Sequence, residues 1–174
     1  MTQAFIGIGS NIAPEQNIRE ALARLSRFVR LTSISTFYRE PAIDRPNDPP
    51  FYNGVVAIET DLPPAELKSG VLRPIEAAIG RRRSADKYDP RAIDLDLLLY
   101  DHLIVSTGEL TLPDPDILSR AFVALPLYEI APQLVLPDCR LPIRQVAAQF
   151  AAENIEPLRE YTESLRDEFC NRGL

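Results

Sequence analysis

Two aspartates inside an apolar segment are the residues of this chain that most directly suggest chemistry. Asp94 and Asp96 alternate with Ile93, Leu95 and Leu97, which is the period-two pattern of a strand with two unlike faces. Both carboxylates therefore share one face, with Cβ atoms roughly 7 Å apart. Two carboxylates at that range repel each other, and a divalent cation relieves the repulsion; hard oxygen ligands suit Mg²⁺, which completes its shell with water and substrate phosphates. The alternative is that both aspartates pair with nearby arginines on an exposed strand.

A cationic segment precedes the aspartates and favours the metal interpretation. Residues 81–91 contain five cationic residues and two aspartates, a local net charge of +3 in a protein whose net charge is −6. Guanidinium groups match phosphate oxygens with paired hydrogen bonds, so these arginines indicate a polyphosphate site. The segment follows a helical pattern that Gly80 is suited to end. The simpler alternative is that the cations complement the negative end of that helix dipole.

Hydrophobic periodicity predicts the elements that must position these side chains. We predict strands over 3–9, 31–39, 52–60 and 91–100, and helices over 14–29 and 63–79. The first helix carries an apolar stripe of Ile18, Leu22, Leu25 and Val29. Pro74 predicts a kink in the second helix. The order βαββαβ predicts an α+β fold, a ferredoxin-like antiparallel sheet with both helices on one face.

Length and composition limit the class of protein. A chain of 174 residues with 45% hydrophobic content predicts a single globular domain over 1–174, with a core at about 3–137 and a C-terminal helical extension over 138–174 that breaks at Pro157. No run approaches the roughly 18 apolar residues of a membrane span, and the N-terminus lacks a signal-peptide pattern, so we expect a cytoplasmic protein. Cys139 and Cys170 are too few and too far apart for a disulfide framework or a zinc site.

Several catalytic and cofactor signatures are absent from the sequence. The segment at 7–11 lacks the third glycine of a dinucleotide fingerprint, and no P-loop is present. We therefore expect Gly7 and Gly9 to allow a tight turn into the first helix. The single histidine, His102, follows an apparent strand end, which disfavours a Ser-His-Asp nucleophile system. The proline-rich loop over 40–51 and the cationic loop over 80–90 are candidate binding loops.

Taken together, these motifs resemble the 6-hydroxymethyl-7,8-dihydropterin pyrophosphokinases of folate biosynthesis. The resemblance covers about residues 4–137. It rests on Gly-Ile-Gly-Ser-Asn at 7–11, Phe-Tyr-Arg-Glu-Pro at 37–41, Phe-Tyr-Asn at 51–53, Gly-Arg-Arg-Arg at 80–83, Asp-Pro-Arg-Ala-Ile-Asp-Leu-Asp at 89–96, Leu-Pro-Asp-Pro at 112–115, Arg-Ala-Phe-Val at 120–123 and Pro-Leu-Tyr-Glu-Ile-Ala-Pro at 126–132. Each segment alone is a weak signal, but the ordered set with this spacing is specific.

The resemblance implies an activity, its cofactor and its site. Enzymes of this family transfer the β,γ-pyrophosphoryl group of ATP to the hydroxymethyl group of a reduced pterin and release AMP, using two Mg²⁺ ions. The implied partners are thus ATP and a reduced pterin, with no nucleic acid and no membrane. The implied metal ligands are Asp94 and Asp96, and the implied catalytic residues are Arg81 and Arg91.

The resemblance also implies the residues that bind each substrate. The implied ATP contacts are Arg73, Glu76, Arg83, Tyr88, Asp114 and Arg120. The implied pterin contacts are Glu40, Pro41, Ile43, Phe51, Asn53 and Phe122. Among these, the two phenylalanines match the aromatic pair that encloses the pterin ring, and Asn53 matches the amide that reads its edge.

The chain departs from the family pattern at four of these positions. Asp114 stands where the family has histidine, Glu40 replaces a small hydroxyl residue, Tyr88 replaces tryptophan and Arg73 replaces a polar amide. A carboxylate about 4 Å from a phosphate charge costs roughly 4 kcal/mol at an effective dielectric constant near 20, unless Arg120 or a cation neutralises Asp114 or its side chain turns away.

Two alternatives to an active enzyme follow. One is a catalytically weakened relative that binds pterin or nucleotide, suggested by Asp114. The other is a nucleic-acid-binding module, since single-strand RNA binders share the ferredoxin-like arrangement; the net charge of −6 and the aspartates on the sheet argue against it. The sequence does not indicate the oligomeric state.

Overall fold

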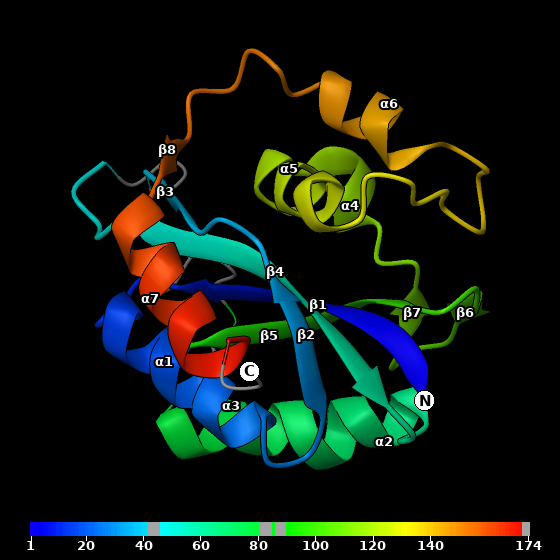
Figure 1. Cartoon of the computed structure of the whole chain (residues 1–174), viewed down its shortest axis with the longest axis horizontal. Helices are drawn as coiled ribbons and strands as arrows, with labels where there is room; N and C mark the ends of the chain where they lie inside the picture. The colour runs from blue at the N-terminus through cyan, green and yellow to red at the C-terminus, as the bar shows by residue number, and fades with distance from the viewer. Residues whose placement is uncertain (42–45, 81–84, 86–89, 172–174) are drawn as a thin grey trace.

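An antiparallel sheet forms the centre of the molecule in the computed structural model, which describes residues 1–41, 46–80, 85 and 90–171 (Figure 1). The strand order is β5-β1-β4-β3-β8, and β2 also pairs with β4. The strands are β1 Thr2–Ser10, β2 Arg30–Ile34, β3 Tyr38–Glu40, β4 Phe51–Thr60, β5 Asp94–Tyr100 and β8 Glu156–Pro157. Every pairing in this sheet is antiparallel. The predicted ferredoxin-like α+β fold is confirmed.

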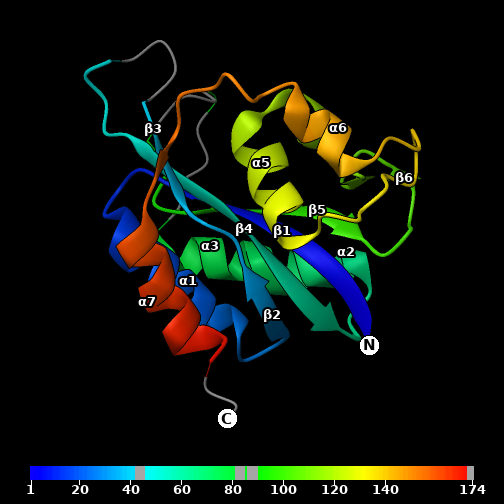
Figure 2. The same cartoon turned by 45° about the horizontal axis from the view of Figure 1, so that its top comes forward.

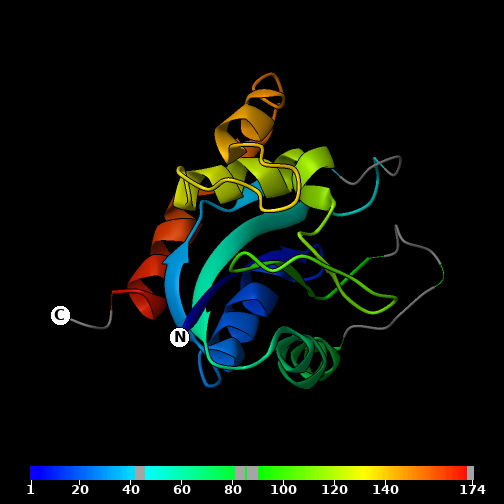
Figure 3. The same cartoon turned by 90° about the vertical axis from the view of Figure 1, so that its right-hand side faces the viewer.

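Helices cover both faces of the sheet (Figures 1 and 3). They are α1 Pro14–Leu25, α2 Pro64–Glu66, the π-helical η1 Leu67–Leu72, α3 Arg73–Ile79, α4 Asp116–Ser119, α5 Ala121–Ile130, α6 Ile143–Ala148 and α7 Arg159–Phe169. The first helical layer consists of α1, the continuous α2–η1–α3 helix and α7, and the second consists of α4, α5 and α6. A short hairpin, β6 Val105–Ser106 and β7 Thr111–Leu112, lies outside the sheet.

The predicted stripe of α1 packs against the sheet. Ile18, Leu22 and Leu25 are fully buried in the first layer together with alternate residues of β1. Val29 is buried as predicted, but α1 ends at Leu25 because residues 26–29 form turns. The helix is therefore one turn shorter than predicted, and its last apolar residue reaches the core from a turn.

The second predicted helix is continuous, with a π-helical stretch in place of the predicted kink, and it ends at Gly80 as predicted. Pro74 is the second residue of α3, two positions after the end of the π-helical stretch η1. Proline has no N–H to donate to the carbonyl four residues earlier, so the backbone before it widens. Gly80 ends the helix with φ of 99°, a conformation that glycine adopts without strain.

The second predicted strand is broken into β2 and β3. At the break the Ser35 N–H donates to the Val55 carbonyl, while Ser35 Oγ accepts from the Val55 N–H, each at 2.9 Å. The side chain thus replaces the backbone in the ladder. Phe37 then bonds to the C-terminal segment: its N–H donates to Thr162 Oγ1 at 2.9 Å, and its carbonyl accepts from the Leu158 N–H at 2.8 Å.

The C-terminal residues pack against the sheet and α1. The segment after α6 runs past β3 to α7 (Figure 2), and Pro157 lies in β8 between the two predicted helices. Leu165 of α7 is fully buried in the first layer, and the Tyr161 hydroxyl donates to the Glu15 carbonyl at 2.9 Å. Among the described residues, no helix is both long enough and apolar enough to cross a membrane.

Candidate active site

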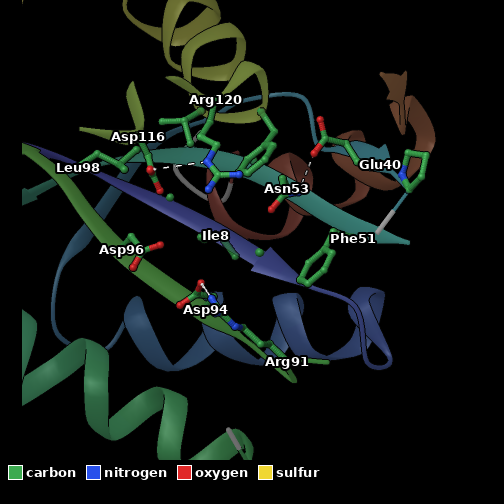
Figure 4. A pocket seen from close by; sticks show the side chains of 16 residues that line it. Ile8, Glu40, Phe51, Asn53, Arg91, Asp94, Asp96, Leu98, Asp116 and Arg120 are labelled. Carbon is green, nitrogen blue, oxygen red and sulfur yellow. Dashed lines mark hydrogen bonds and ion pairs between the residues drawn. The ribbon is translucent and has the colours of Figure 1, made fainter. Parts of the chain in front are cut away.

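The two aspartates of β5 face a cavity, as their spacing predicted. Leu95 and Leu97 are buried in the first layer, whereas Asp94 and Asp96 lie with Leu98 on the opposite face. There they line a cavity of about 270 Å³ (Figure 4). The same alternation therefore anchors the strand on one face and presents two carboxylates on the other.

Two glycines of β1 leave the cavity open between the aspartates and the neighbouring strand. Gly9 pairs with Asp94 on one side and Asn53 on the other, and Gly7 pairs with Asp96. A Cβ on Gly9 would lie 2.6 Å from Asn53 Oδ1. The expectation that these glycines form a tight turn is wrong, because both lie inside β1, where their missing side chains make room for Asn53 and for a ligand.

The end of β1 holds the segment that leads into β5. Asn11 Oδ1 accepts from the Arg91 N–H at 2.7 Å, and Ser10 Oγ donates to the Ala92 carbonyl at 2.6 Å. These bonds take Arg91 and Ala92 out of the strand, so β5 begins three residues later than predicted. Arg91 Nη1 in turn donates to Asp94 Oδ2 at 2.7 Å. The arginine pairing considered as an alternative is therefore present at Asp94, and it fixes that carboxylate at the cavity wall.

Glu76 holds the outer edge of β5. Glu76 is 4% exposed as a residue, and its Oε1 accepts from the Leu95 N–H at 2.8 Å, between the two aspartates. Arg73 is half-buried at the start of the same helix, α3. The structure thus brings α3 beside the aspartates, and the role of both residues in binding nucleotide stays a prediction.

The implied pterin residues line the opposite end of the same cavity. They are Glu40, Pro41, Phe51, Asn53 and Phe122. Asn53 is 8% exposed, and its Nδ2 donates to Glu40 Oε2 at 3.4 Å. Burial raises the pKa of Glu40 from 4.5 to about 7; Glu153 adds to the rise, and Arg120 and the Asn53 hydrogen bond oppose it. A carboxyl group of this kind titrates near neutral pH.

Arg120 and Asp116 form the wall of the cavity nearest the second helical layer. Arg120 Nε lies 3.7 Å from Asp116 Oδ1, and its guanidinium carbon lies 5.8 Å from the centre of the Phe122 ring. The sequence reasoning missed Asp116, although it lines the cavity. Its place two residues after Asp114, at the spacing that singled out the β5 aspartates, was the available signal.

The side chain of Asp114 turns toward the start of α4. Its Oδ1 accepts from the Asp116 N–H at 2.8 Å, and its own N–H donates to the Leu98 carbonyl at 2.9 Å. Burial raises the pKa of Asp114, and the backbone bond from Asp116 opposes the rise. Asp114 is not among the described residues that line the cavity. Of the possibilities that the sequence left open, this geometry favours a carboxyl group that turns away from the cavity.

A family model and several curated relatives match most of this chain. The model described as 7,8-dihydro-6-hydroxymethylpterin-pyrophosphokinase (HPPK) matches residues 5–132. This chain belongs to the HPPK family. It is 37% identical over 154 residues to 2-amino-4-hydroxy-6-hydroxymethyldihydropteridine pyrophosphokinase of Haemophilus influenzae, covering 87% of this chain and 94% of the relative. The relative of the same name from Methylorubrum extorquens is 40% identical over 159 residues, covering 90% and 98%.

Solved structures support the HPPK fold independently. The crystal structure of Plasmodium falciparum HPPK-DHPS with pterin and p-hydroxybenzoate matches with a TM-score of 0.68 at 12% sequence identity. The match covers 87% of this chain and 42% of that chain. At this identity the likeness concerns the fold alone.

The cavity carries donors that suit the magnesium expected for an HPPK. Asp94, Asp96 and Asp116 contribute carboxylate oxygens, and the described lining residues include neither histidine nor cysteine. Within the described part of the chain, no three metal-binding side chains gather closely enough to hold an ion by themselves. The carboxylate donors fit Mg²⁺, which takes one or two protein carboxylates and completes its shell with water and phosphate oxygens.

Four predicted site residues lie outside the described residues. They are Ile43, Arg81, Arg83 and Tyr88. Their assigned roles in binding pterin and ATP and in catalysis rest on the sequence resemblance alone and stay predictions.

Proposed function

We propose that this protein transfers the β,γ-pyrophosphoryl group of ATP to the hydroxymethyl group of 6-hydroxymethyl-7,8-dihydropterin and releases AMP, a step of folate biosynthesis. Membership of the HPPK family supports the proposal. The observation that carries it is that two carboxylates and, across a glycine-lined strand, a buried amide line the same cavity. One space thus adjoins both a candidate site for a metal-bound polyphosphate and a candidate site for a flat heterocycle.

The polyphosphate end of the cavity would be held by charge. Asp94 and Asp96 are the proposed ligands of two Mg²⁺ ions, which when bound neutralise phosphate charge and align the reacting groups. Arg91 orients Asp94 through its 2.7 Å bond. Arg120 lines the cavity and is a proposed phosphate ligand, as Arg81 is by resemblance.

The transfer makes and breaks one bond at the β-phosphorus. The pterin hydroxyl oxygen bonds to the β-phosphorus, and the bond from that phosphorus to the oxygen bridging the α-phosphate breaks. AMP leaves with the bridging oxygen, and the hydroxyl proton is released. Because no covalent bond to the protein is needed, the side chains act by alignment and by stabilising developing charge.

The other end of the cavity has the features of a pterin site. Phe51 and Phe122 line the cavity with aromatic rings, which suit a flat heterocycle, and Asn53 lines the same cavity with an amide. We propose Ile43 and Pro41 as further pterin contacts and Arg73, Glu76, Arg83, Tyr88 and Asp114 as residues around the nucleotide. The cytoplasmic location also stays a prediction.

The alternative of a weakened relative has lost much of its basis. It rested on a carboxylate at Asp114 facing ATP, and that carboxylate accepts a hydrogen bond from the Asp116 backbone. We therefore propose an active enzyme.

The test is release of AMP from ATP and Mg²⁺, measured with and without 6-hydroxymethyl-7,8-dihydropterin. We expect AMP that depends on both the pterin and the metal, and no AMP after chelation of the metal. Asp101→Asn is a control variant that should release AMP as the wild type does, since Asp101 is an exposed turn residue just beyond β5. Failure of the pterin to increase AMP release in the wild type would overturn the proposal.

A further inference from the structure

Glu40 and Asn53 form a polar pair at the pterin end of the cavity. Glu40 lies opposite Phe51 in the β3–β4 ladder, and Asn53 lies two residues further along β4. Side chains at such positions share one face of the sheet. Both line the cavity, and the Asn53 Nδ2 donates to Glu40 Oε2 at 3.4 Å (Figure 4).

The Glu40 carboxylate determines which way the amide of Asn53 points. An ionised carboxylate can only accept hydrogen bonds, so the amide must turn its NH₂ group toward it. The amide oxygen then lies on the cavity side of β1, beside Gly9, which also lines the cavity and on which a Cβ would lie 2.6 Å from that oxygen. A protonated Glu40 could instead donate to the amide oxygen, which would allow the reversed amide. The charge of Glu40 thus decides whether the buried amide offers the cavity an acceptor or a donor.

Charged groups from two other segments act on Glu40. Glu153, in the segment between α6 and β8, repels its carboxylate, while Arg120, which precedes α5, attracts it. Together with burial, their effect places the pKa of Glu40 at about 7. The ionised and the protonated forms of Glu40 are therefore both populated near neutral pH.

We propose that Glu40 is a positioning residue that holds Asn53 with its oxygen toward the cavity, so that the site selects a ring edge rich in N–H donors and loses affinity when Glu40 is protonated. The aminopyrimidinone edge of a pterin carries such donors. The inference rests on the proposed function and deepens it, because it assigns the control of pterin affinity to a residue that departs from the family pattern.

The experiment measures the dissociation constant of 6-hydroxymethyl-7,8-dihydropterin by its fluorescence, at pH 6 to 8, with Mg²⁺ and a non-hydrolysable ATP analogue. If only the ionised form holds the amide productively, affinity should weaken about 10-fold between pH 8 and pH 6 in the wild type. Glu40→Gln should give an affinity that is nearly constant across this range. In turnover, the pH effect of Glu40 should appear in the KM for the pterin and not in kcat.

Two further variants make the test specific. Glu153→Gln removes the repelling charge and should move the midpoint of the pH dependence to lower pH while keeping its amplitude. Glu160→Gln, on the exposed side of α7, should leave both midpoint and amplitude unchanged. If Glu40→Gln does not fold, the Glu153→Gln shift still tests the proposal.

Three outcomes would overturn the inference. They are a flat wild-type affinity between pH 6 and 8, a Glu40→Gln variant that keeps the wild-type slope, and a Glu153→Gln midpoint that does not move. Absence of pterin-dependent AMP release at every pH is a different failure, since it would overturn the proposed function itself.

Discussion

The two faces of the sheet have different roles: one carries the core packing and the other carries the candidate site. Helices α1, α2–η1–α3 and α7 cover one face, and α4, α5 and α6 cover the other (Figure 3). The first, the closed face, is a continuous apolar core, whereas the second, the open face, is apolar over part of its length and then borders the cavity. Both faces are built from the same strands. Leu95 and Leu97 pack on the closed face, so Asp94 and Asp96 are fixed on the open one. The comparison teaches that the placement of the chemical groups depends on packing that lies on the other side of the sheet.

The largest expected effect comes from removing a charge on the open face. Asp94→Asn deletes a proposed metal ligand, and AMP release should fall about 10²–10³-fold, since electrostatic stabilisation of a transferring phosphoryl group has contributions of that size. The melting temperature should fall by only a few degrees, because the variant loses the charge that pairs with Arg91 but leaves the closed face untouched. Asp101→Asn is the control for loss of an acid near the same strand. Activity within a few-fold of wild type would mean that Asp94 is not a metal ligand.

A cavity created in the closed face should lower stability and leave activity nearly unchanged. Leu22 is fully buried, and Leu22→Ala should reduce the free energy of unfolding by about 2–5 kcal/mol. The fraction of the Leu22→Ala variant that folds should keep a kcat near that of wild type. Urea denaturation measures the stability, and Phe28→Ala, at a side chain that is 57% exposed, is the control. A loss below about 1 kcal/mol would show that the closed face does not carry the core packing.

An added methyl group on the open face should impair substrate binding. Gly9→Ala places a Cβ 2.6 Å from Asn53 Oδ1, so the amide must move. Overpacking of this kind costs about 1–3 kcal/mol, and a displacement of Asn53 should raise the KM for the pterin about 10-fold. Steady-state kinetics checks this against Gly108→Ala, where an added Cβ meets no atom within 4 Å. Equal KM values in the two variants would contradict the assigned role of Gly9.

The smallest expected effect concerns stability and pH. The pKa of Glu40 is raised in the folded protein to about 7, so its ionisation favours unfolding, and the stability it contributes at acid pH is lost as the pH rises from about 4.5 through about 7. At pH 8 the free energy of unfolding of Glu40→Gln should therefore exceed that of wild type by about 1–2 kcal/mol. This is less than the full pKa shift implies, because the side chain is partly solvated.

Urea titrations at pH 4 and pH 8 measure this difference, which should vanish at the acid end. Glu160→Gln is the matched control and should track the wild type at both pH values. A Glu40→Gln variant less stable than wild type at pH 8 would contradict the assigned burial of the carboxylate.

Local patterns predicted most of the fold, and remote contacts account for the errors. The strand alternation at Asp94 and Asp96 and the ends of the second helix depend on neighbours in sequence, and both are confirmed. The break between β2 and β3 depends on bonds from Phe37 to Thr162 and Leu158. No window of sequence around residue 37 contains that information.

The candidate site shows the same limit. The motifs identified both ends of the cavity, but Gly9 was assigned to a turn because its sequence does not reveal that Asn53 fills the space beside it. Asp116 was missed because its partner, Arg120, lies one helical turn further on, in a segment whose boundaries were not predicted.

The short strand β8 has a consequence for solubility. Tyr38 and Arg39 of β3 pair with Pro157 and Glu156, so β8 and not β3 is the outermost strand on that side of the sheet. An uncovered β3 would present backbone donors and acceptors on which another chain could add a strand. The outer strand that replaces it is two residues long and contains a proline, which cannot donate to a further ladder. The C-terminal segment thereby protects an exposed sheet edge from intermolecular pairing and aggregation.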